Sequence, residues 1–271
     1  MPRVIVLATC VLAIWGGAVA AQAQAPAGQI SPTDLKQVAS LRSLMDIPTI
    51  ADQHPDVYYR KLGVRAYQDG DKVRALRMFL KSSSYADKIA QAMVATMYWN
   101  GEGTPSDHPR AYAWMDLAAD RGYRDLLIQR ERYWNQLSDA ERKQALAVGR
   151  EVYAEYGDER GLRRLQLKFS AVLANVTGSH AGFLGNGGTL FTSGVGNGRR
   201  QSVGVVPANL QTVLEGTSGT FVDNDQRYAS YVWNAKQYAR LKDIEWKLMA
   251  GHVEVGPLQV LPAPSGTSPS K

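Results

Sequence analysis

Residues 90–123 read AQAMVATMYWNGEGTPSDHPRAYAWMDLAADRGY and contain most of two short segments with helical spacing. In each segment, small or apolar residues recur every three or four positions, as they do on the buried face of a helix. The first set is Ile89, Ala92, Met93, Thr96 and Met97, and the second set is Ala111, Trp114, Met115 and Ala118. The pattern predicts two helices that bury these faces against neighbouring helices.

The residues between the two segments have the chemistry of helix ends. Gly101 and Gly103 tolerate the left-handed backbone conformation that terminates a helix. Asp107 is a favourable N-cap for the second helix, and Pro109 is tolerated in its first turn. Gly122 marks the expected end of the second helix.

This arrangement resembles a Sel1-like repeat, a relative of the tetratricopeptide repeat. The matching residues, in order, are Tyr98, Gly101, Gly103, Asp107, Ala111, Trp114, Ala118, Ala119 and Gly122. The family's Leu-Gly pair is replaced by Val94-Ala95, and Ala95 is still small enough for close helix packing. The resemblance implies a helical scaffold that binds proteins or peptides, with no catalytic residues and no cofactor.

Similar stripes on both sides of this stretch predict further repeats. Ala111, Trp114 and Ala118 have counterparts at the same spacing before and after them, and a fixed period is typical of stacked repeats. The counterparts are Ala75, Met78 and Ser82, then Ala145, Val148 and Val152. We therefore expect a mainly α fold in which residues 56–157 form a short α-solenoid of about three antiparallel helix pairs. The first pair turns at Gly70-Asp71, and the last helix begins at a capping box of Ser138 and Glu141.

The first 25 residues have the features of a secretory signal peptide. Arg3 gives a positive start, an apolar stretch from Ile5 to Val19 follows, and small residues then recur in A-x-A spacing. The chain's one cysteine, Cys10, lies inside this segment, so the mature chain is expected to lack disulfides. An exported chain without disulfides indicates a bacterial protein that is periplasmic or secreted, with no stable membrane span after signal cleavage.

Residues 26–55 are interpreted as a linker or tether, because Pro26, Pro32, Pro48 and Pro55 interrupt them. Within the tether, residues 31–43 have the pattern of a short helix that is ordered only if it docks. The apolar side of that helix is Leu35, Val38, Ala39 and Leu41.

Residues 158–175 follow the repeats as a basic helix with Leu162, Leu165, Phe169 and Leu173 on one side. This helix is expected to cap the stack, and the alternative is a helix that lies on a membrane surface.

The C-terminal part of the chain changes character. Residues 176–262 are a Gly-rich region followed by a helical one, and residues 263–271 are expected to be a disordered tail. In the Gly-rich part, Phe191 and the valines Val203, Val205 and Val206 suggest an irregular or β region, either a poorly packed hairpin or a disordered loop. The helical part, residues 228–250, carries apolar residues at Trp233, Tyr238, Leu241, Ile244, Trp246 and Leu248.

The sequence lacks the motifs of several enzyme classes. His54, His108, His180 and His252 are the only histidines, and no two of them have metal-ligand spacing. Neither H-E-x-x-H nor G-x-S-x-G occurs. We therefore predict no catalytic site, no metal site and no enzyme activity.

The net charge of +6 is spread over acidic and basic residues that alternate along the helices. This mixture is typical of solvated helix faces rather than a nucleic-acid surface. The leading hypothesis is a scaffold that binds a protein or peptide of the cell envelope. Its binding residues are expected to be Trp99, Arg110 and Tyr112, which fall outside the predicted buried stripe. The alternative is a protein that binds or hydrolyses cell-wall polymer, with peptidoglycan as partner, through the C-terminal region.

Overall fold

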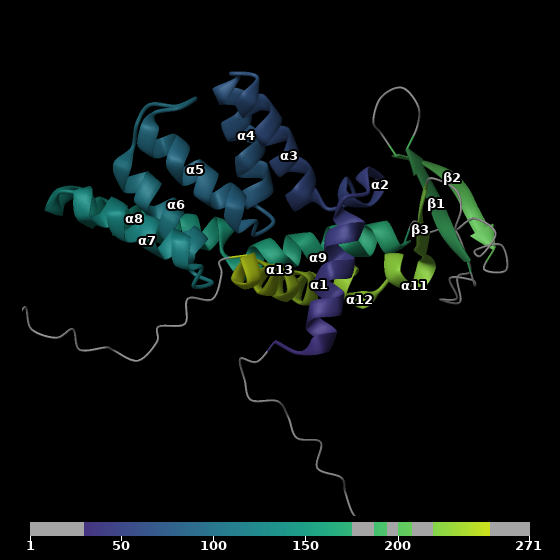
Figure 1. The fold of residues 1–271 in the computed structure, drawn as a ribbon. Helices are drawn as coiled ribbons and strands as arrows, with labels where there is room; N and C mark the ends of the chain where they lie inside the picture. Colours follow the sequence, from purple (N-terminus) through teal and green to yellow (C-terminus); the bar gives the residue numbers. More distant parts are fainter. Residues whose placement is uncertain (1–29, 175–186, 194–199, 208–218, 250–271) are drawn as a thin grey trace, which may run out of the picture.

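The structure is a computed structural model, and it describes residues 30–174, 187–193, 200–207 and 219–249. The repeat region consists of helices connected by short turns (Figure 1). These helices are α3 (Pro55–Gln68), α4 (Lys72–Ser83), α5 (Lys88–Asn100), α6 (His108–Ala119), α7 (Arg124–Gln136) and α8 (Asp139–Tyr156). The helix pair α5 and α6 lies at its centre and corresponds to the stretch that resembles a Sel1-like repeat.

The helix ends of this central pair are those that the sequence predicts. Gly101 ends α5 with a φ of 71°, and Gly122 follows α6 with a φ of 76°. Asp107 caps α6 by accepting a hydrogen bond of 2.9 Å from the backbone N–H of Arg110. Gly103 has a φ of 73° and lies so close to α4 that a Cβ atom there would be 2.4 Å from the carbonyl oxygen of Lys72. The loop therefore also fixes the distance between the first and second helix pairs.

The buried face is as predicted for α6 and differs from the prediction for α5. Ala111, Trp114, Met115 and Ala118 are all buried, which confirms the α6 stripe. On α5, the buried residues are Lys88, Ala90, Gln91, Val94, Ala95 and Met97. Ile89 is exposed, and Ala92, Met93 and Thr96 are half-buried, so only Met97 of the predicted α5 stripe is fully buried. The reason is packing on two sides, because small residues let α4 and α6 approach α5 closely.

The first predicted pair is present, and the third is not a helix hairpin. Gly70 has a φ of 84°, and Asp71 then caps α4, as expected for a tight turn between α3 and α4. The capping box of Ser138 and Glu141 also begins α8 as predicted. However, α7 and α8 each pack mainly against α6 rather than against each other. Helix α7 buries only Leu126 and Tyr133, so it offers too little apolar surface to make a hairpin with α8.

The expected tether is instead a packed part of the fold. Helix α1 (Pro32–Met45) begins at a capping box of Ser31 and Asp34, and α2 (Pro48–Ala51) follows it. Leu41, Leu44, Ile47 and Ile50 of this segment are buried. They belong to a second hydrophobic core, because α1 crosses the C-terminal helix and covers its apolar side.

This second core combines segments from both ends of the chain. Besides α1 and α2, its members lie on α9 (Asp158–Ala174), α12 (Ser230–Trp233) and α13 (Ala235–Met249), and a short helix α11 (Asn224–Arg227) precedes α12. Leu165 and Phe169 of α9 are buried here, and Leu162 is partly buried against the same core. This burial contradicts the membrane-surface alternative for residues 158–175, since that helix would need to present these side chains outward.

The Gly-rich region contains a small antiparallel sheet. Its strands are β1 (Gly187–Ser193), β2 (Arg200–Pro207) and β3 (Gly219–Asp223), in the order β2-β1-β3, with an irregular register between Leu190 and Phe191. Phe191 lies in β1, and Val203, Val205 and Val206 lie in β2. The predicted signal peptide, most of the glycine tract and the predicted C-terminal tail lie outside the described residues.

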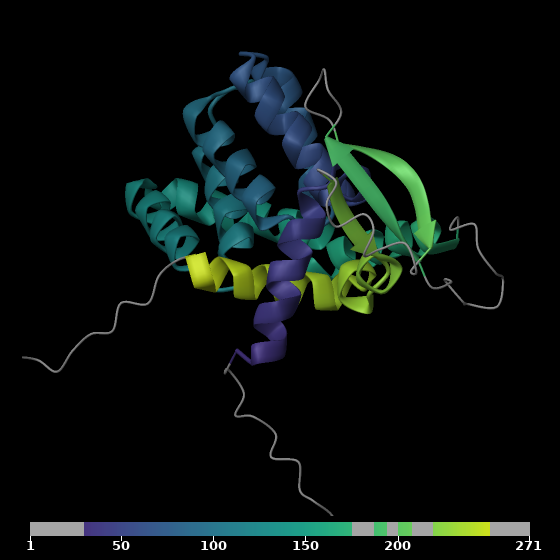
Figure 2. The ribbon, with the colours of Figure 1, turned by 45° about the vertical axis from the view of Figure 1, so that its right-hand side comes forward.

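Helix α13 joins the two halves of the molecule. Figures 1 and 2 show α13 running below the repeat helices, with α1 lying across it. Tyr238, Leu241 and Ile244 of α13 belong to the second core, whereas Trp246 packs against the core of the repeats. Among the described helices, none has the length and hydrophobicity needed to cross a membrane.

Candidate functional site

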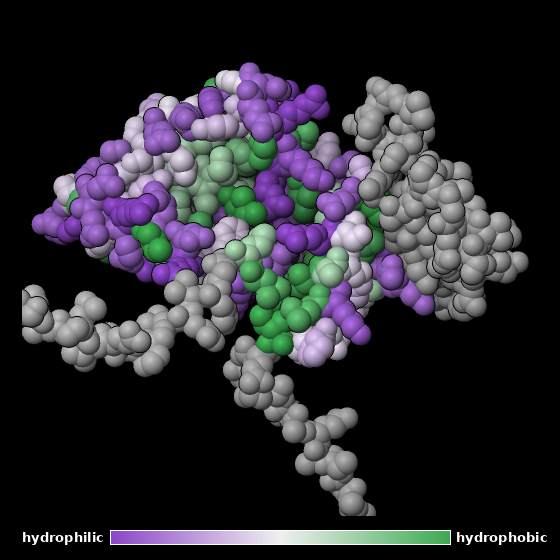
Figure 3. Space-filling model, viewed as in Figure 1, coloured by the Kyte–Doolittle hydropathy of each residue, from purple (hydrophilic) through white to green (hydrophobic). Residues whose placement is uncertain are grey.

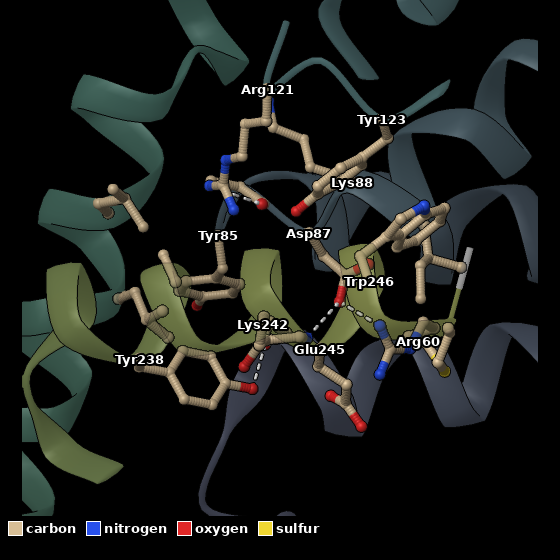
Figure 4. Close-up of a pocket in the computed structure, with 17 residues that line it drawn as sticks. Arg60, Tyr85, Asp87, Lys88, Arg121, Tyr123, Tyr238, Lys242, Glu245 and Trp246 are labelled. Atoms are coloured by element: carbon tan, nitrogen blue, oxygen red, sulfur yellow. Dashed lines mark hydrogen bonds and ion pairs between the residues drawn. The ribbon is translucent and has the colours of Figure 1, made fainter. Parts of the chain in front are cut away.

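A pocket of about 230 Å³ lies where α13 meets the repeat helices (Figure 4). Its walls come from α3, the turn between α4 and α5, the end of α6, α9 and α13. The charged residues among them are Asp56, Arg60, Asp87, Lys88, Arg121, Lys242 and Glu245. We call this cavity the junction pocket, because the core of the repeats and the second core meet around it.

Asp87 connects three elements at the junction pocket. It is the N-cap of α5, where its Oδ1 atom accepts a hydrogen bond of 2.9 Å from the backbone N–H of Ala90. Its Oδ2 atom lies 2.8 Å from Arg60 of α3 and 3.6 Å from Lys242 of α13. The side chain is fully buried, so these partners replace the water that a carboxylate requires. Figure 4 shows Lys242 and Arg60 converging on Asp87.

Asp56 lies beside Asp87 and is also buried. Its Oδ2 atom accepts a hydrogen bond of 2.8 Å from the hydroxyl of Tyr238 and lies 3.4 Å from Lys242. Burial by itself would raise the pKa of Asp56, but the charges of Lys242 and Arg60 and the hydrogen bond from Tyr238 outweigh it, so the pKa is lowered overall. The Oδ1 atom of Asp56 has no hydrogen-bond partner within the part of the chain that the structure describes.

A second group of charges holds α9 and α13 to the repeats. Lys88 is buried and lies 2.7 Å from Asp120 and 2.9 Å from Asp158. Arg121 lies 2.7 Å from Asp158 and 3.1 Å from Asp243, and Tyr123 donates a hydrogen bond to Asp243. Burial by itself would lower the pKa of Arg121. The hydrogen bond to Asp158 and the charges of Asp158 and Asp243 have the larger effect and raise this pKa, so the guanidinium stays charged.

The two groups are separate sets of ion pairs. Asp56 and Asp87 pair with Arg60 and Lys242, whereas Asp120, Asp158 and Asp243 pair with Lys88 and Arg121. Glu245, which also lines the pocket, is paired with Arg42 of α1 at 3.2 Å. The charged side chains that line the junction pocket are therefore four bases and three acids.

The remaining wall of the junction pocket is apolar and leads to an exposed rim. Trp246 stacks on Tyr123 with ring centroids 4.4 Å apart, and Tyr85 and Tyr238 also line the cavity. Ile89 and Met249 line it as well and are 36% and 60% exposed. Figure 3 shows apolar residues gathered where α1, α13 and the repeat helices meet, with hydrophilic residues around them.

His54 lies in the second core, close to Asp56. Its ring is fully buried among Phe169, Trp233 and Tyr238, with centroids 4.7 to 4.9 Å away. Neither ring nitrogen has a hydrogen-bond partner among the described residues. Burial lowers the pKa of His54 to about 4, so the ring is neutral near pH 7. Its environment suits a packed core residue, and the described residues contain no group of three or more His, Cys, Asp or Glu side chains that could hold a metal ion.

The residues predicted to bind a partner do not meet around one pocket. Trp99 is half-buried and stacked between Tyr133 and His108, with centroids 4.0 and 4.3 Å away. Tyr112 packs on Trp134, and burial raises the pKa of its hydroxyl. Arg110 pairs with Asp107 at 3.0 Å and lines an open polar pocket beside the repeat loop. None of the three lines the junction pocket.

The sequence contained only a weak signal for the junction pocket. Asp87 precedes a helical segment and could have been recognised as an N-cap, but its ion pair with Lys242 joins residues that are far apart in the chain. Charged residues on predicted helices are usually solvated. For this reason, Asp56, Lys88 and Lys242 were not predicted to line a pocket.

Comparison with known proteins identifies the central repeat. Residues 88–123 match the family model of the Sel1 repeat, so this stretch is a Sel1 repeat. No curated protein matches the chain. A similar solved structure is that of a protective antigen present in uropathogenic Escherichia coli strains, which displays an SLR fold. The two sequences are 17% identical, the alignment covers 56% of this chain and 35% of that chain, and the TM-score is 0.38.

Proposed function

We propose that this Sel1-repeat chain is a scaffold that binds a protein or peptide partner in the cell envelope. The partner lies on the face where α13 crosses the repeat helices and inserts one side chain into the junction pocket. The observation that carries this proposal is the junction pocket itself, a cavity with charged and aromatic walls next to an exposed apolar rim. Sel1 repeats typically mediate protein–protein interaction, which supports a binding role rather than catalysis.

The geometry of the rim supports this assignment of the binding face. Ile89 and Met249 expose apolar surface at the rim, and Trp246 and Tyr123 form an aromatic wall inside it. Interfaces commonly place such aromatic residues at their centre, with polar residues around them. The charged residues beside α13 supply that polar surround.

The cellular address in this proposal is periplasmic or secreted. It is supported by the predicted signal peptide of residues 1–25 and by the absence of cysteine from the rest of the sequence. An alkaline phosphatase fusion to the chain, with and without residues 1–25, tests this address. Activity that is independent of residues 1–25 would contradict export by a signal peptide.

Site-specific photo-crosslinking in intact cells tests the binding face. A photoreactive amino acid is placed at Ile89 or Met249 on the rim, or at Leu146, an exposed residue of α8 that does not line the junction pocket. We expect the same partner to be captured from both rim positions and not from Leu146. Capture from Leu146 alone would place the partner on another surface.

The positions predicted from the sequence provide a second comparison. Trp99→Ala and Tyr112→Ala change half-buried aromatic residues that do not line the junction pocket. We expect the folded double variant to be captured from Ile89 as the parent is. Loss of capture in a folded double variant would return the binding site to these residues.

A cell-wall polymer is the alternative ligand. Sedimentation of the purified chain with sacculi tests this hypothesis separately, because a polymer ligand needs no partner protein. Salt-sensitive co-sedimentation, together with no crosslinked protein at either rim position, would favour the polymer.

A further inference from the structure

We propose that a groove along α4 docks an acidic amphipathic helix of a protein partner. The groove has a volume of about 420 Å³. One wall is α4, and the other consists of Gly103 in the repeat loop and the end of α8. We call this surface the α4 groove. It adds a second binding surface to the proposed function, because it shares no lining residue with the junction pocket.

The α4 groove follows an apolar stripe along most of α4. Val73, Leu76 and Leu80 recur at helical spacing and line the groove, together with Tyr156 at the end of α8. Val73 is 63% exposed, Leu76 is buried, and Leu80 and Tyr156 are partly buried against the core of the repeats. Helix α4 packs mainly against α3 and α5, which leaves this stripe facing the groove (Figure 1). A partner helix laid along α4 can contact the stripe with apolar residues at the same spacing.

Two bases of α4 determine the charge of the occupant. Arg77 and Lys81 line the α4 groove four residues apart, both are exposed, and neither forms an ion pair with a described residue. The third charged residue of the lining, Glu155, is paired with Arg160 at 3.1 Å and with Arg164. Glu155 therefore does not neutralise Arg77 or Lys81. Carboxylates beside the apolar face of a partner helix would complement these two bases.

The combination of stripe and charge favours a protein helix over a polyanion. Nucleic acid or polyphosphate would pair with Arg77 and Lys81 but would leave the apolar surface of Val73 and Leu80 in water. A basic amphipathic helix would cover the stripe but place like charges side by side, which costs free energy. An acidic amphipathic helix covers the stripe and pairs with both bases.

Selection from a displayed library tests this preference. The full chain is the target, and the library randomises the exposed positions of a helix as long as α4, 12 residues, held in a small scaffold. A parallel selection uses the Arg77→Glu/Lys81→Glu variant, which reverses the charge of the groove. We expect the parent to enrich leucine or isoleucine at helical spacing with Asp or Glu beside them, and the reversed variant to enrich Lys or Arg instead. Equal enrichment of acidic helices by both proteins, or no helix that depends on the groove, would overturn the proposal.

Further variants locate the site of the enriched helices. Val73→Ser removes an exposed apolar side chain and keeps every charge. Lys143→Glu/Arg150→Glu makes the same charge reversal at two exposed bases of α8 that do not line the groove. We expect binding to weaken about tenfold in Val73→Ser and in Arg77→Glu/Lys81→Glu, and to stay as in the parent in the α8 control.

The groove variants change exposed side chains, so they are expected to fold, and circular dichroism checks this. Exchange of glutamate for lysine in an enriched helix should restore its binding to the reversed variant. If the reversed variant does not fold, Val73→Ser decides the question. Parent-like binding to a folded Val73→Ser variant, or an equal loss in the α8 control, would exclude the groove.

Polyphosphate tests the alternative occupant. Groove-dependent binding of polyphosphate, together with no enriched helix, would assign the α4 groove to a polyanion and overturn the proposal. The result is separate from crosslinking at Ile89 and Met249, which lie at the junction pocket. Failure of the α4 groove to bind a helix would leave the proposed function intact, and failure of crosslinking at the rim would leave the α4 groove intact.

Discussion

Gly103 shows how one residue can set the distance between two helix pairs. Its backbone is left-handed, and its Cα faces the carbonyl of Lys72 with no room for a side chain. Gly122 has nearly the same backbone angle, but a Cβ atom there would meet nothing within 4 Å. Substitutions at the two glycines can therefore be compared, and the difference between them gives the free-energy cost of the steric clash apart from the cost of the backbone conformation.

We predict that Gly103→Ala destabilises the fold more than Gly122→Ala does. Both substitutions cost about 1–2 kcal/mol for the left-handed conformation. Gly103→Ala adds about 1–3 kcal/mol because the new methyl group overlaps the backbone of α4. Urea unfolding followed by circular dichroism measures both values. Equal losses would mean that the loop moves away from α4 without cost.

Because His54 is buried and neutral, we predict that the folded protein loses stability in mild acid. Its pKa is about 4 in the folded state and about 6.5 in the unfolded state, so the unfolded chain takes up the proton first as the pH falls. Stability is therefore highest above pH 6.5 and declines by about 3 kcal/mol as the pH falls to 4.

The His54→Leu variant tests this assignment. Leucine has no nitrogen to leave unpaired and no proton to gain, so the variant is expected to lose this pH dependence. The pH profile of the urea midpoint is the measurement. The pKa of Asp34 is lowered to about 2 by its hydrogen bond to Arg240, so the contribution of Asp34 to stability is lost only below the pH range in which His54 acts. A parent-like slope between pH 6.5 and 4 in His54→Leu would exclude His54 as its source.

At the scale of elements, the start of α5 combines a local and a distant task. Asp87 caps α5 and also holds Arg60 of α3 and Lys242 of α13. Asp71 caps α4 in the same way, through Arg74 at 2.9 Å, but in an exposed position. The two caps therefore share a local role and differ in their tertiary role.

We predict that Asp87→Asn is costly although it retains a capping oxygen. It leaves Arg60 and Lys242 without one of their carboxylates, which costs about 3–5 kcal/mol for a buried pair. Asp87→Ala also removes the cap and costs about 1 kcal/mol more, and Asp71→Ala costs about 1 kcal/mol in total. Denaturant midpoints of the three variants provide the comparison. A small effect of Asp87→Asn would show that water replaces the carboxylate charge.

At the scale of the whole molecule, α13 makes the two cores dependent on each other. Its first half fills the second core, and Trp246 packs on the core of the repeats. Asp243 adds its bonds to Arg121 and Tyr123. Separating the halves would expose both apolar surfaces and separate buried ion pairs, so neither half is expected to unfold alone.

We predict that native-state hydrogen exchange finds one opening unit. The slowest amides of α5, α6 and α13 should exchange with the same free energy and the same denaturant dependence. In Trp246→Ala, the amides of α13 should exchange earlier than those of α5 and α6, because the contact between the halves is weakened. If the amides of α13 in the parent exchanged independently of those of α5 and α6, the expected dependence of the two cores on each other would be contradicted.

The sequence alone determined the central repeat, because the signals for it are local. Gly101, Gly103, Asp107 and Gly122 specify helix ends within a few residues, and the stripe on α6 requires only helical spacing. These properties can be read from residues that are neighbours in the chain.

Tertiary structure alone decided the docking of α1, the packing of α7 and α8 and the junction pocket. Asp56 and Lys242 are 186 residues apart, and Asp34 and Arg240 are 206 residues apart. No periodicity or motif connects such positions, and each residue by itself has the character of a solvated helix surface. Their role follows from which helix faces meet, and that is fixed by the burial of apolar surface over the whole chain.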